Sequence, residues 1–242
     1  MISVCIATYN GERFIGEQLA SILPQLGEND EIVISDDQST DRTLELIAGF
    51  NDARIKVVHH QRYTRHDFPL DCTTHNFENA LKHSRGDIIF LADQDDVWFP
   101  DKVRKCMNEL LDCDFVVCDC SVTDESLHVV MPSYFTFMHS NLSTLRNLTS
   151  CTWLGCCMAF RRSVLNRALP FPETHVAHDL WLGLIATSRF RCKLICEPLS
   201  YYRRHQNTAS PVSKKNSYSL WFKIKYRLFA IKEYIRSIVR ND

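Results

Sequence analysis

Short apolar runs alternate with segments of helical periodicity over the first 120 residues of the chain. Consecutive apolar positions predict strands that are buried on both faces, and apolar positions three or four apart predict helices that cover them. The predicted strands are 3–7, 31–35, 55–58, 87–92 and 115–118, and the predicted helices are 14–23, 43–50, 77–83 and 101–111. The order strand, helix, strand, helix, strand in the first part of the chain predicts a parallel, Rossmann-like half.

The pattern is weaker outside these elements. Residues 59–74 are polar without periodicity and predict a loop that closes over a ligand, with Asn76 as the cap of the helix that follows. Residues 119–149 also lack periodicity and predict loops. The later predictions are a strand over 153–162 that leads into a helix over 163–169, a helix over 180–187, and two strands over 193–196 and 200–202.

The end of the chain carries one continuous helical stripe. Its apolar members are three or four residues apart and comprise Trp221, Ile224, Leu228, Ile231, Ile235 and Ile238. This stripe either docks on protein, as part of the same chain or of a second subunit, or sinks into a membrane interface while basic neighbours meet anionic lipid. We therefore expect a catalytic-sized domain over 1–212 and a basic amphipathic tail over 213–242.

Charge is unevenly distributed along the 242 residues. The formal net charge is -1, but residues 214–242 hold eight Lys or Arg and two acids, so they carry +6 and the remainder -7. The balance argues against nucleic acid as the main partner. The length fits one domain, or one domain with an appendage.

The cellular compartment is predicted from what the chain lacks. No run approaches the roughly 18 apolar residues that span a bilayer, and residues 1–7 begin a strand instead of a signal peptide. Eleven cysteines without a signal indicate a reducing cytosol, and their close spacing favours small buried hydrophobes over zinc ligands. We expect a cytoplasmic protein, either free or peripheral on the inner face of the cell membrane.

Aspartates follow two of the predicted strands. Asp36 and Asp37 end the second strand, and Asp93, Asp95 and Asp96 end the fourth. Ligands of parallel sheets bind at this carboxyl edge. If the chain stays extended, Asp93 and Asp95 lie on the same side and can grip a hard divalent cation. Asp96 then assists through water or caps a turn, and the first pair, taken alone, also fits a turn and helix cap.

A nucleotide would suit two such acidic clusters. One cluster can accept hydrogen bonds from a base or ribose, and the other can hold a cation at the phosphates. The chain has neither G-x-G-x-x-G nor G-x-x-x-x-G-K-[ST], which argues against a dinucleotide dehydrogenase and a P-loop enzyme. Phosphate charge would have to be neutralised by a metal and by basic side chains.

Several motifs together resemble glycosyltransferase family 2. The first three are SVCIATYNG at 3–11, ISDDQSTDRT at 34–43 and LADQDDVW at 91–98. Three later motifs resemble the bacterial branch labelled rhamnosyltransferase-like, and they are GCCMAFRR at 155–162, HDLW at 178–181 and YRRH at 202–205. The resemblance covers residues 2 to about 210, and the order and spacing of the motifs make it specific.

The resemblance implies an α/β protein of GT-A fold, with a Rossmann-like, mostly parallel central sheet flanked by helices and a C-terminal amphipathic helix. It also implies a nucleotide-sugar donor, a Mg or Mn ion and inversion at the anomeric carbon. The implied nucleotide-sugar site comprises Thr8, Tyr9, Asn10, Glu12, Asp36, Asp37, Asp93 and Gln94. Within it, Tyr9 and Asp37 would hold the base, and either Asp36 or Asp93 the ribose side.

The resemblance also assigns the chemistry. Asp95 would be the principal metal ligand, and His205 matches a late histidine that either approaches the metal or diphosphate or is a bystander. Asp179 matches the catalytic base, a role compatible with capping the helix over 180–187. His178 replaces an acid usual in the family and fits a local structural role better than catalysis.

The implied activity is transfer of a single sugar, rhamnose or another hexose, to a glycan or lipid-linked glycan acceptor in bacterial surface polysaccharide synthesis, such as that of lipopolysaccharide. The chain lacks the Q-x-x-R-W signature and the membrane spans of processive synthases, which favours one sugar per event. Two alternatives remain. One is a non-catalytic glycan- or partner-binding module, and the other is a sugar nucleotidyltransferase, whose usual glycine-rich basic loop residues 8–12 do not resemble.

Overall fold

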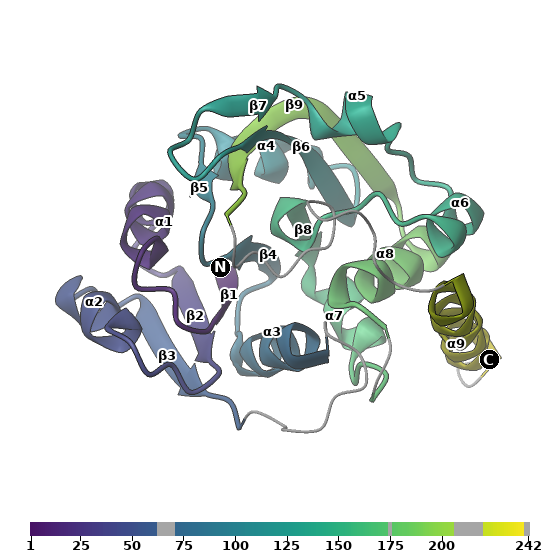
Figure 1. Ribbon diagram of the computed structural model, residues 1–242, viewed down its shortest axis with the longest axis horizontal. Helices are drawn as coiled ribbons and strands as arrows, with labels where there is room; N and C mark the ends of the chain where they lie inside the picture. Colours follow the sequence, from purple (N-terminus) through teal and green to yellow (C-terminus); the bar gives the residue numbers. More distant parts are fainter. Residues whose placement is uncertain (62–70, 174–175, 206–219, 240–242) are drawn as a thin grey trace.

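A nine-stranded mixed sheet forms the centre of the protein (Figure 1). The computed structural model describes residues 1–61, 71–173, 176–205 and 220–239. The strand order is β3-β2-β1-β4-β8-β6-β9-β5, with β7 paired to β6. The strands are β1 Ile2–Thr8, β2 Glu31–Asp36, β3 Ile55–His59, β4 Ile88–Asp93, β5 Val97–Trp98, β6 Phe115–Thr123, β7 Val129–Met131, β8 Met158–Arg161 and β9 Cys192–Arg203.

Helices surround this sheet. They are α1 Ile15–Ile22, α2 Thr43–Gly49, α3 Asp71–His83, α4 Lys102–Glu109, α5 Tyr134–Met138, α6 Thr144–Thr149, α7 Arg162–Ala168, α8 His178–Arg189 and α9 Leu220–Val239, with short 3-10 turns over Leu23–Gln25 and Gly155–Cys157. None of the helices in the described part of the chain combines the length and apolarity that a bilayer crossing requires.

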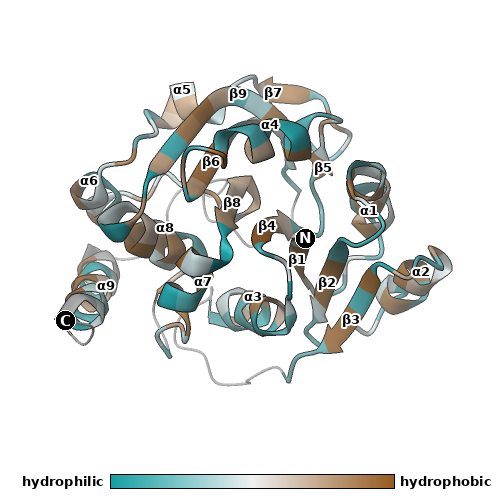
Figure 2. Cartoon of the chain, turned by 180° about the vertical axis from the view of Figure 1, so that it is seen from behind, coloured by the Kyte–Doolittle hydropathy of each residue, from teal (hydrophilic) through white to brown (hydrophobic). Residues whose placement is uncertain are grey.

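The predicted Rossmann-like half is confirmed. β3, β2, β1 and β4 are parallel neighbours, with α1 and α2 on one side and α3 on the other (Figure 1). The apolar runs of β1, β2 and β4 are buried and appear as brown strands in the interior (Figure 2). Strands covered on both faces have no solvent side to alternate with, so their apolar runs are continuous.

The second half departs from the parallel pattern. β8 runs antiparallel between β4 and β6, and β9 is parallel to β6 but antiparallel to β5. The two predicted late strands form the single strand β9, and residues 119–149 hold the end of β6, β7, α5 and α6 in place of loops alone. Polar side chains conceal the pattern there, because Asp119 is buried and its Oδ1 accepts the Phe135 amide hydrogen at 2.9 Å.

The helix predicted over 77–83 begins earlier, at Asp71, and Asn76 is not its cap. Asn76 lies inside α3, where its Nδ2 donates to the Thr8 carbonyl oxygen at 3.1 Å. The first turns of α3 therefore face the sheet with polar side chains that have partners, which no apolar periodicity could reveal. The rest of the predicted loop, 62–70, lies outside the described residues.

Cysteines serve the core, as the sequence predicts. All eleven are free, and seven of them are buried. The prediction for the tail is only half right. α9 forms and packs on α6 and α8, but its inner face uses Tyr226, Phe229 and Ala230, whereas Trp221 and Leu228 of the predicted stripe are exposed. The boundary predicted between 212 and 213 lies outside the described residues.

Candidate active site

The carboxyl ends of β1, β2 and β4 meet at one edge of the sheet. In the parallel register Thr8 pairs with Asp36, and Ala7 pairs with Asp93. The Asp37 amide then donates to the Thr8 carbonyl oxygen at 2.9 Å, which extends the contact by one residue. The sheet therefore brings the two predicted acidic clusters to the same edge.

Two loops at this edge, residues 8–12 and 36–43, bind each other and are called the loop pair below. Asn10, with a left-handed φ of 47°, donates its amide hydrogen to Ser39 Oγ at 2.9 Å and accepts from the Thr40 amide at 2.8 Å. Asp36 accepts from the Ser39 amide at 3.0 Å and from Ser39 Oγ at 2.6 Å. Glu12 accepts the Arg42 amide hydrogen at 3.0 Å. Asn10, Glu12 and Asp36 thus shape the loop pair.

Gln94 ties the loop pair to the end of β4. Its Oε1 accepts from Thr8 Oγ1 at 2.5 Å and from the Tyr9 amide at 2.9 Å, and its Nε2 donates to the Tyr9 carbonyl oxygen at 3.2 Å. Tyr9 itself is 41% exposed. Its backbone is fixed while its side chain borders solvent, as a residue that stacks on a base requires.

Asp37 is held differently from Asp36. Its side chain is buried, and its Oδ1 lies 2.9 Å from His60 Nδ1. His60 comes from the start of the polar segment after β3, to which the sequence assigned no individual role. The pair gives Asp37 a fixed orientation at the mouth of the loop pair.

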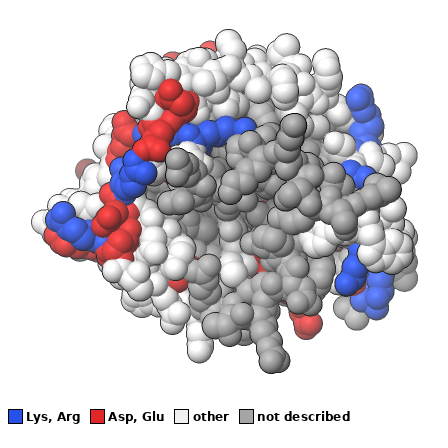
Figure 3. Space-filling view, in the orientation of Figure 1, with Lys and Arg blue, Asp and Glu red and all other residues white. Residues whose placement is uncertain are grey.

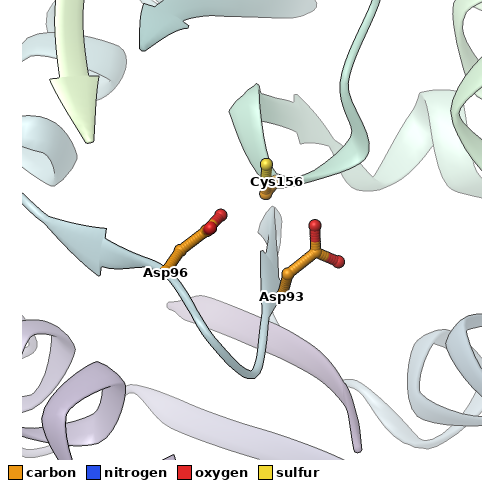
Figure 4. Close-up of side chains that lie close together, drawn as sticks. All are labelled: Asp93, Asp96 and Cys156. Carbon is orange, nitrogen blue, oxygen red and sulfur yellow. The ribbon is translucent and has the colours of Figure 1, made fainter. Parts of the chain in front are cut away.

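The acid turn, residues 93–96, does not stay extended. β4 ends at Asp93 and the chain bends at once, so the prediction that Asp93 and Asp95 share one side of a strand is wrong. Asp93 instead lies with Asp96 and Cys156, whose ligand atoms are all within 4.8 Å of one another. Figure 4 shows Asp96 and Asp93 on either side of Cys156, with the Asp96 carboxyl group directed into the space between the three side chains. Side chains alternate between the two faces only along an extended strand, so a turn ends this alternation.

Arg203, at the end of β9, holds the acid turn in place. Its amide donates to Asp96 Oδ1 at 3.1 Å, its Nε to the Asp95 carbonyl oxygen at 2.8 Å, and its Nη1 to the Glu125 carbonyl oxygen at 2.9 Å. Its Nη2 pairs with Glu17. Four contacts from one buried guanidinium group and its backbone therefore fix where the acidic side chains point.

Asp95 contacts His205, which follows the end of β9. Asp95 Oδ2 lies 2.8 Å from His205 Nε2, and both side chains are largely buried. His205 also lies against the Phe14 ring, with ring centroids 4.8 Å apart. The structure thus brings together the two residues that the resemblance implies as metal ligands, across 110 positions of sequence.

The acid turn concentrates negative charge. Burial and then the Asp95 charge raise the pKa of Asp93 to about 7, and burial followed by the charges of Asp93 and Asp95 raises the pKa of Asp96. Asp96 is fully buried, and its Oδ2 has no hydrogen-bond partner among the described residues. A divalent cation would relieve both conditions, so oxygen-rich surroundings of this kind fit Mg²⁺ or Mn²⁺.

Asp179 lies in the first turn of α8, behind the cap position, which belongs to Ala177. The alternative role as helix cap is therefore excluded, although Asp179 Oδ1 accepts the Leu180 amide hydrogen at 2.6 Å. Burial raises the pKa of Asp179 to about 6, and its charge adds to the raised pKa of Asp93. A carboxyl group so tuned is suited to accept a proton near neutral pH.

His178 has a structural environment, as the sequence favoured. Its ring stacks on Phe77 with centroids 4.2 Å apart, and it fills the space beside Gly155, where an added Cβ would come within 2.4 Å of Nε2. Burial lowers the pKa of His178 to about 3. The side chain is therefore neutral, which removes it as a proton donor at ordinary pH.

Two residues at the site were not identified from the sequence. Arg203 lay inside a quoted motif but had no assigned role, and its spacing from the acids carries no signal because β9 is far away in the chain. Cys156 also lay in a motif, yet a cysteine in an apolar run is more often core. Only the pairing of β8 with β4 brings its segment to the acid turn.

Solved glycosyltransferases share this fold. The structure of S. aureus TarS 1–349 in complex with UDP-GlcNAc matches with a TM-score of 0.70 at 19% identity, covering 95% of this chain and 66% of that one. The mannosyltransferase PcManGT from Pyrobaculum calidifontis, in complex with GDP-Man and Mn2+, matches with a TM-score of 0.60 at 20% identity, covering 100% and 64%. These likenesses show the GT-A fold that the resemblance implied.

Sequence relatives are bacterial glycosyltransferases. WfgD of Escherichia coli, a UDP-Glc:alpha-D-GlcNAc-diphosphoundecaprenol beta-1,3-glucosyltransferase, is 26% identical over 91% of this chain and 84% of its own. The putative teichuronic acid biosynthesis glycosyltransferase TuaG of Bacillus subtilis is 26% identical over 92% and 86%. The dTDP-rhamnosyl transferase RfbG of Shigella flexneri is 34% identical over 44% and 37%, so rhamnose is one sugar among several. Glycosyl transferase family 2 matches residues 3–169, most of the chain, and the protein therefore belongs to this family of sugar-transferring enzymes.

Proposed function

We propose that the protein is an inverting, metal-dependent glycosyltransferase that moves one sugar per event from a nucleotide-sugar donor to a glycan or lipid-linked glycan acceptor. Bacterial surface polysaccharide synthesis is the setting, as the names of WfgD and TuaG suggest for those relatives. The observation that carries the proposal is the meeting of the loop pair, the acid turn and the Asp95–His205 contact at one edge of the sheet. The sugar is rhamnose or another hexose.

The donor nucleotide would bind at the loop pair. Tyr9 stacks on the base, and Asp37 accepts a hydrogen bond from it, because its carboxylate is already oriented by His60. Thr8, Asn10, Glu12, Asp36 and Gln94 hold the loops that surround the nucleotide. For the ribose, Asp93 is favoured over Asp36, since both Asp36 oxygens already accept from Ser39.

The diphosphate would lie over the acid turn. Asp95 and His205 are the proposed ligands of Mg²⁺ or Mn²⁺, supported by their 2.8 Å contact and by the absence of a phosphate-binding glycine loop. The bound ion supplies positive charge that stabilises the departing nucleoside diphosphate. Arg203 keeps Asp95 and Asp96 in position from behind.

Asp179 would perform the proton transfer. The acceptor hydroxyl oxygen attacks the anomeric carbon as the bond from that carbon to the diphosphate oxygen breaks. Asp179 accepts the hydroxyl proton at the same time, for which its pKa of about 6 is suited. Attack from the face opposite the leaving group inverts the anomeric configuration, and one base suffices because the leaving group needs no proton.

Nucleotide-dependent thermal protection tests the donor site. Wild-type protein should melt at higher temperature with UDP, dTDP or GDP, whichever base fits, when Mg²⁺ or Mn²⁺ is present. Asp95→Ala should lose this protection, whereas Asp112→Ala, the same change on an exposed turn, should keep it. Absence of protection by every nucleoside diphosphate tried, with either metal, would refute the proposal.

Turnover separates the alternatives. Slow donor hydrolysis without acceptor is expected of a transferase, because water can replace the acceptor hydroxyl. A non-catalytic glycan- or partner-binding module on the same fold would leave the nucleotide sugar uncleaved, and a nucleotidyltransferase would form the nucleotide sugar from a nucleoside triphosphate and a sugar phosphate. Chromatography of the reaction products distinguishes the transferase, the binding module and the nucleotidyltransferase, because release of nucleoside diphosphate is expected of the transferase.

A further inference from the structure

α9 has two apolar faces, and only one of them packs on the protein. The inner face contains Tyr226, Phe229 and the fully buried Ala230. The outer face consists of Trp221, Ile224, Leu228 and Ile235, which are exposed by 75%, 38%, 61% and 53%. At 3.6 residues per turn their separations of three, four and seven residues place them in one strip along the helix. A strip of large apolar side chains in water needs a partner.

Basic residues border the outer face. Lys225, Lys232 and Arg236 are exposed and follow the same spacing, so they form a second strip directly beside the apolar one, which we call the basic flank. Within α9 the described acid is Glu233, and it pairs with Arg236 at 2.6 Å. In Figure 3 a blue patch lies at the lower right, where Figure 1 shows α9. The last 29 residues carry +6 on a chain whose net charge is -1.

We infer that the outer face and basic flank of α9 bind an anionic lipid surface. Adjacent apolar and basic strips fit a helix lying in the interface plane, with the large side chains among the acyl chains and the ammonium groups at the phosphates. A second copy fits less well. An antiparallel two-fold contact between outer faces would set the two basic flanks side by side, where their like charges repel.

The opposite face of α9 lies next to the candidate acceptor side. This inner face reaches the start of α8, where the Ala177 amide donates to Tyr226 Oη at 3.4 Å, two residues before Asp179. A bilayer on the outer face would therefore bring lipid-linked molecules to within the thickness of one helix of the segment that carries Asp179. This consequence rests on the proposed function, whereas lipid binding itself does not.

Vesicle binding tests the inference without donor or acceptor. Full-length protein should sediment with vesicles of phosphatidylcholine containing one part in three of phosphatidylglycerol, and bind pure phosphatidylcholine vesicles far more weakly. Leu228→Glu should lower the partition coefficient by about tenfold or more. Leu111→Glu, an equally drastic change at a leucine 74% exposed beyond α4, should leave it unchanged. Equal loss in both variants would overturn the assignment to α9.

Charge and depth are measured separately. Lys225→Gln with Lys232→Gln should weaken binding by about 25-fold, since each lysine near an anionic surface contributes about fivefold. Trp98, Trp153 and Trp181 are at most 5% exposed, so quenching by brominated lipid reports on Trp221. Unquenched Trp221 with bound vesicles would overturn the inference. A second result would also overturn it. In that result, light scattering shows a wild-type dimer that Leu228→Glu dissociates, and the wild-type protein does not bind vesicles. Nucleotide protection is read in separate samples, so the two proposals can fail independently.

Discussion

At the loop pair, polar side chains of two loops hydrogen-bond to each other, whereas Asp179 at the start of α8 is partly buried and accepts from backbone amides, that of Leu180 among them. Hydrogen bonds inside the loop pair contribute to folding and leave the nucleotide side ready before a ligand arrives. Burial of Asp179 opposes folding but raises its pKa toward the range in which a base works. On the donor side of the proposed reaction, polar groups are thus hydrogen-bonded to one another. On the acceptor side, the Asp179 carboxyl group is poorly solvated.

The largest effect is expected where the two sides differ most. Asp179→Asn should lower transfer by about 10²- to 10⁴-fold, the usual contribution of a positioned base. Nucleotide-dependent thermal protection should remain, because the loop pair and acid turn are untouched. Initial rates and melting curves on the same sample measure both. A variant that transfers sugar at nearly the wild-type rate would remove Asp179 from the mechanism.

The pH profile sharpens the same point. Below pH about 6 the Asp179 carboxyl group is protonated and cannot accept the hydroxyl proton, so activity should fall tenfold for each unit of pH below that value. This loss of activity at low pH should be absent from the residual activity of Asp179→Asn. If the variant loses activity at low pH in the same way as the wild-type protein, the titrating group is another residue.

The loop pair should respond in stability. Ser39→Ala removes the hydroxyl that donates to Asp36 and accepts from Asn10, and it leaves a buried carboxylate oxygen without that partner. We expect a loss of about 1–3 kcal/mol in the free energy of unfolding. Thr40→Ala is the matched control, because the Thr40 side chain is exposed and its Oγ1 makes only a long hydrogen bond, of 3.4 Å, to Asn10 Oδ1. Urea unfolding of both variants makes the comparison, and equal losses would contradict it.

The smallest effect has the opposite sign. The raised pKa of Asp179 means that the folded state holds its proton more tightly than the unfolded chain, whose ordinary value is 3.8. Stability from this group is therefore complete below pH about 4 and lost as pH rises through about 6. Asp179→Asn should stabilise the protein at pH 8 by less than the roughly 3 kcal/mol that the whole shift would give, because the side chain is only partly buried, and by little at pH 4. A destabilised variant at pH 8 would contradict the burial cost.

The fold was predictable wherever a segment is buried by apolar residues alone. β1, β2 and β4 have such runs, and the aspartates after β2 and β4 marked the carboxyl edge. Segments buried by polar residues with internal partners were not predictable. Asp119 in β6 and Asn76 in α3 are examples, because their hydrogen bonds depend on residues distant in the chain.

The candidate site followed the same rule. Residue types and order pointed to the two acidic clusters, and the resemblance proposed Asp179 and His205, but neither gave the positions of these residues relative to one another. Because the chain bends after Asp93, the Asp93 side chain lies with Asp96 and Cys156, whereas the sequence predicted Asp95 as its neighbour. The stripe of α9 illustrates a second limit, since periodicity locates an apolar strip without saying whether protein covers it.

β9 has a consequence for how a newly made chain matures. It is the last strand of the described residues, and its Arg203 reaches back 108 residues to Asp95 and 186 residues to Glu17. Such distant segments meet late, because a long loop must close before their contact forms. On a ribosome, the acid turn is therefore made well before Arg203 and His205, which lie 108 and 110 residues after Asp95. A nascent chain that ends before β9 would hold the acid turn without the side chains that fix its position.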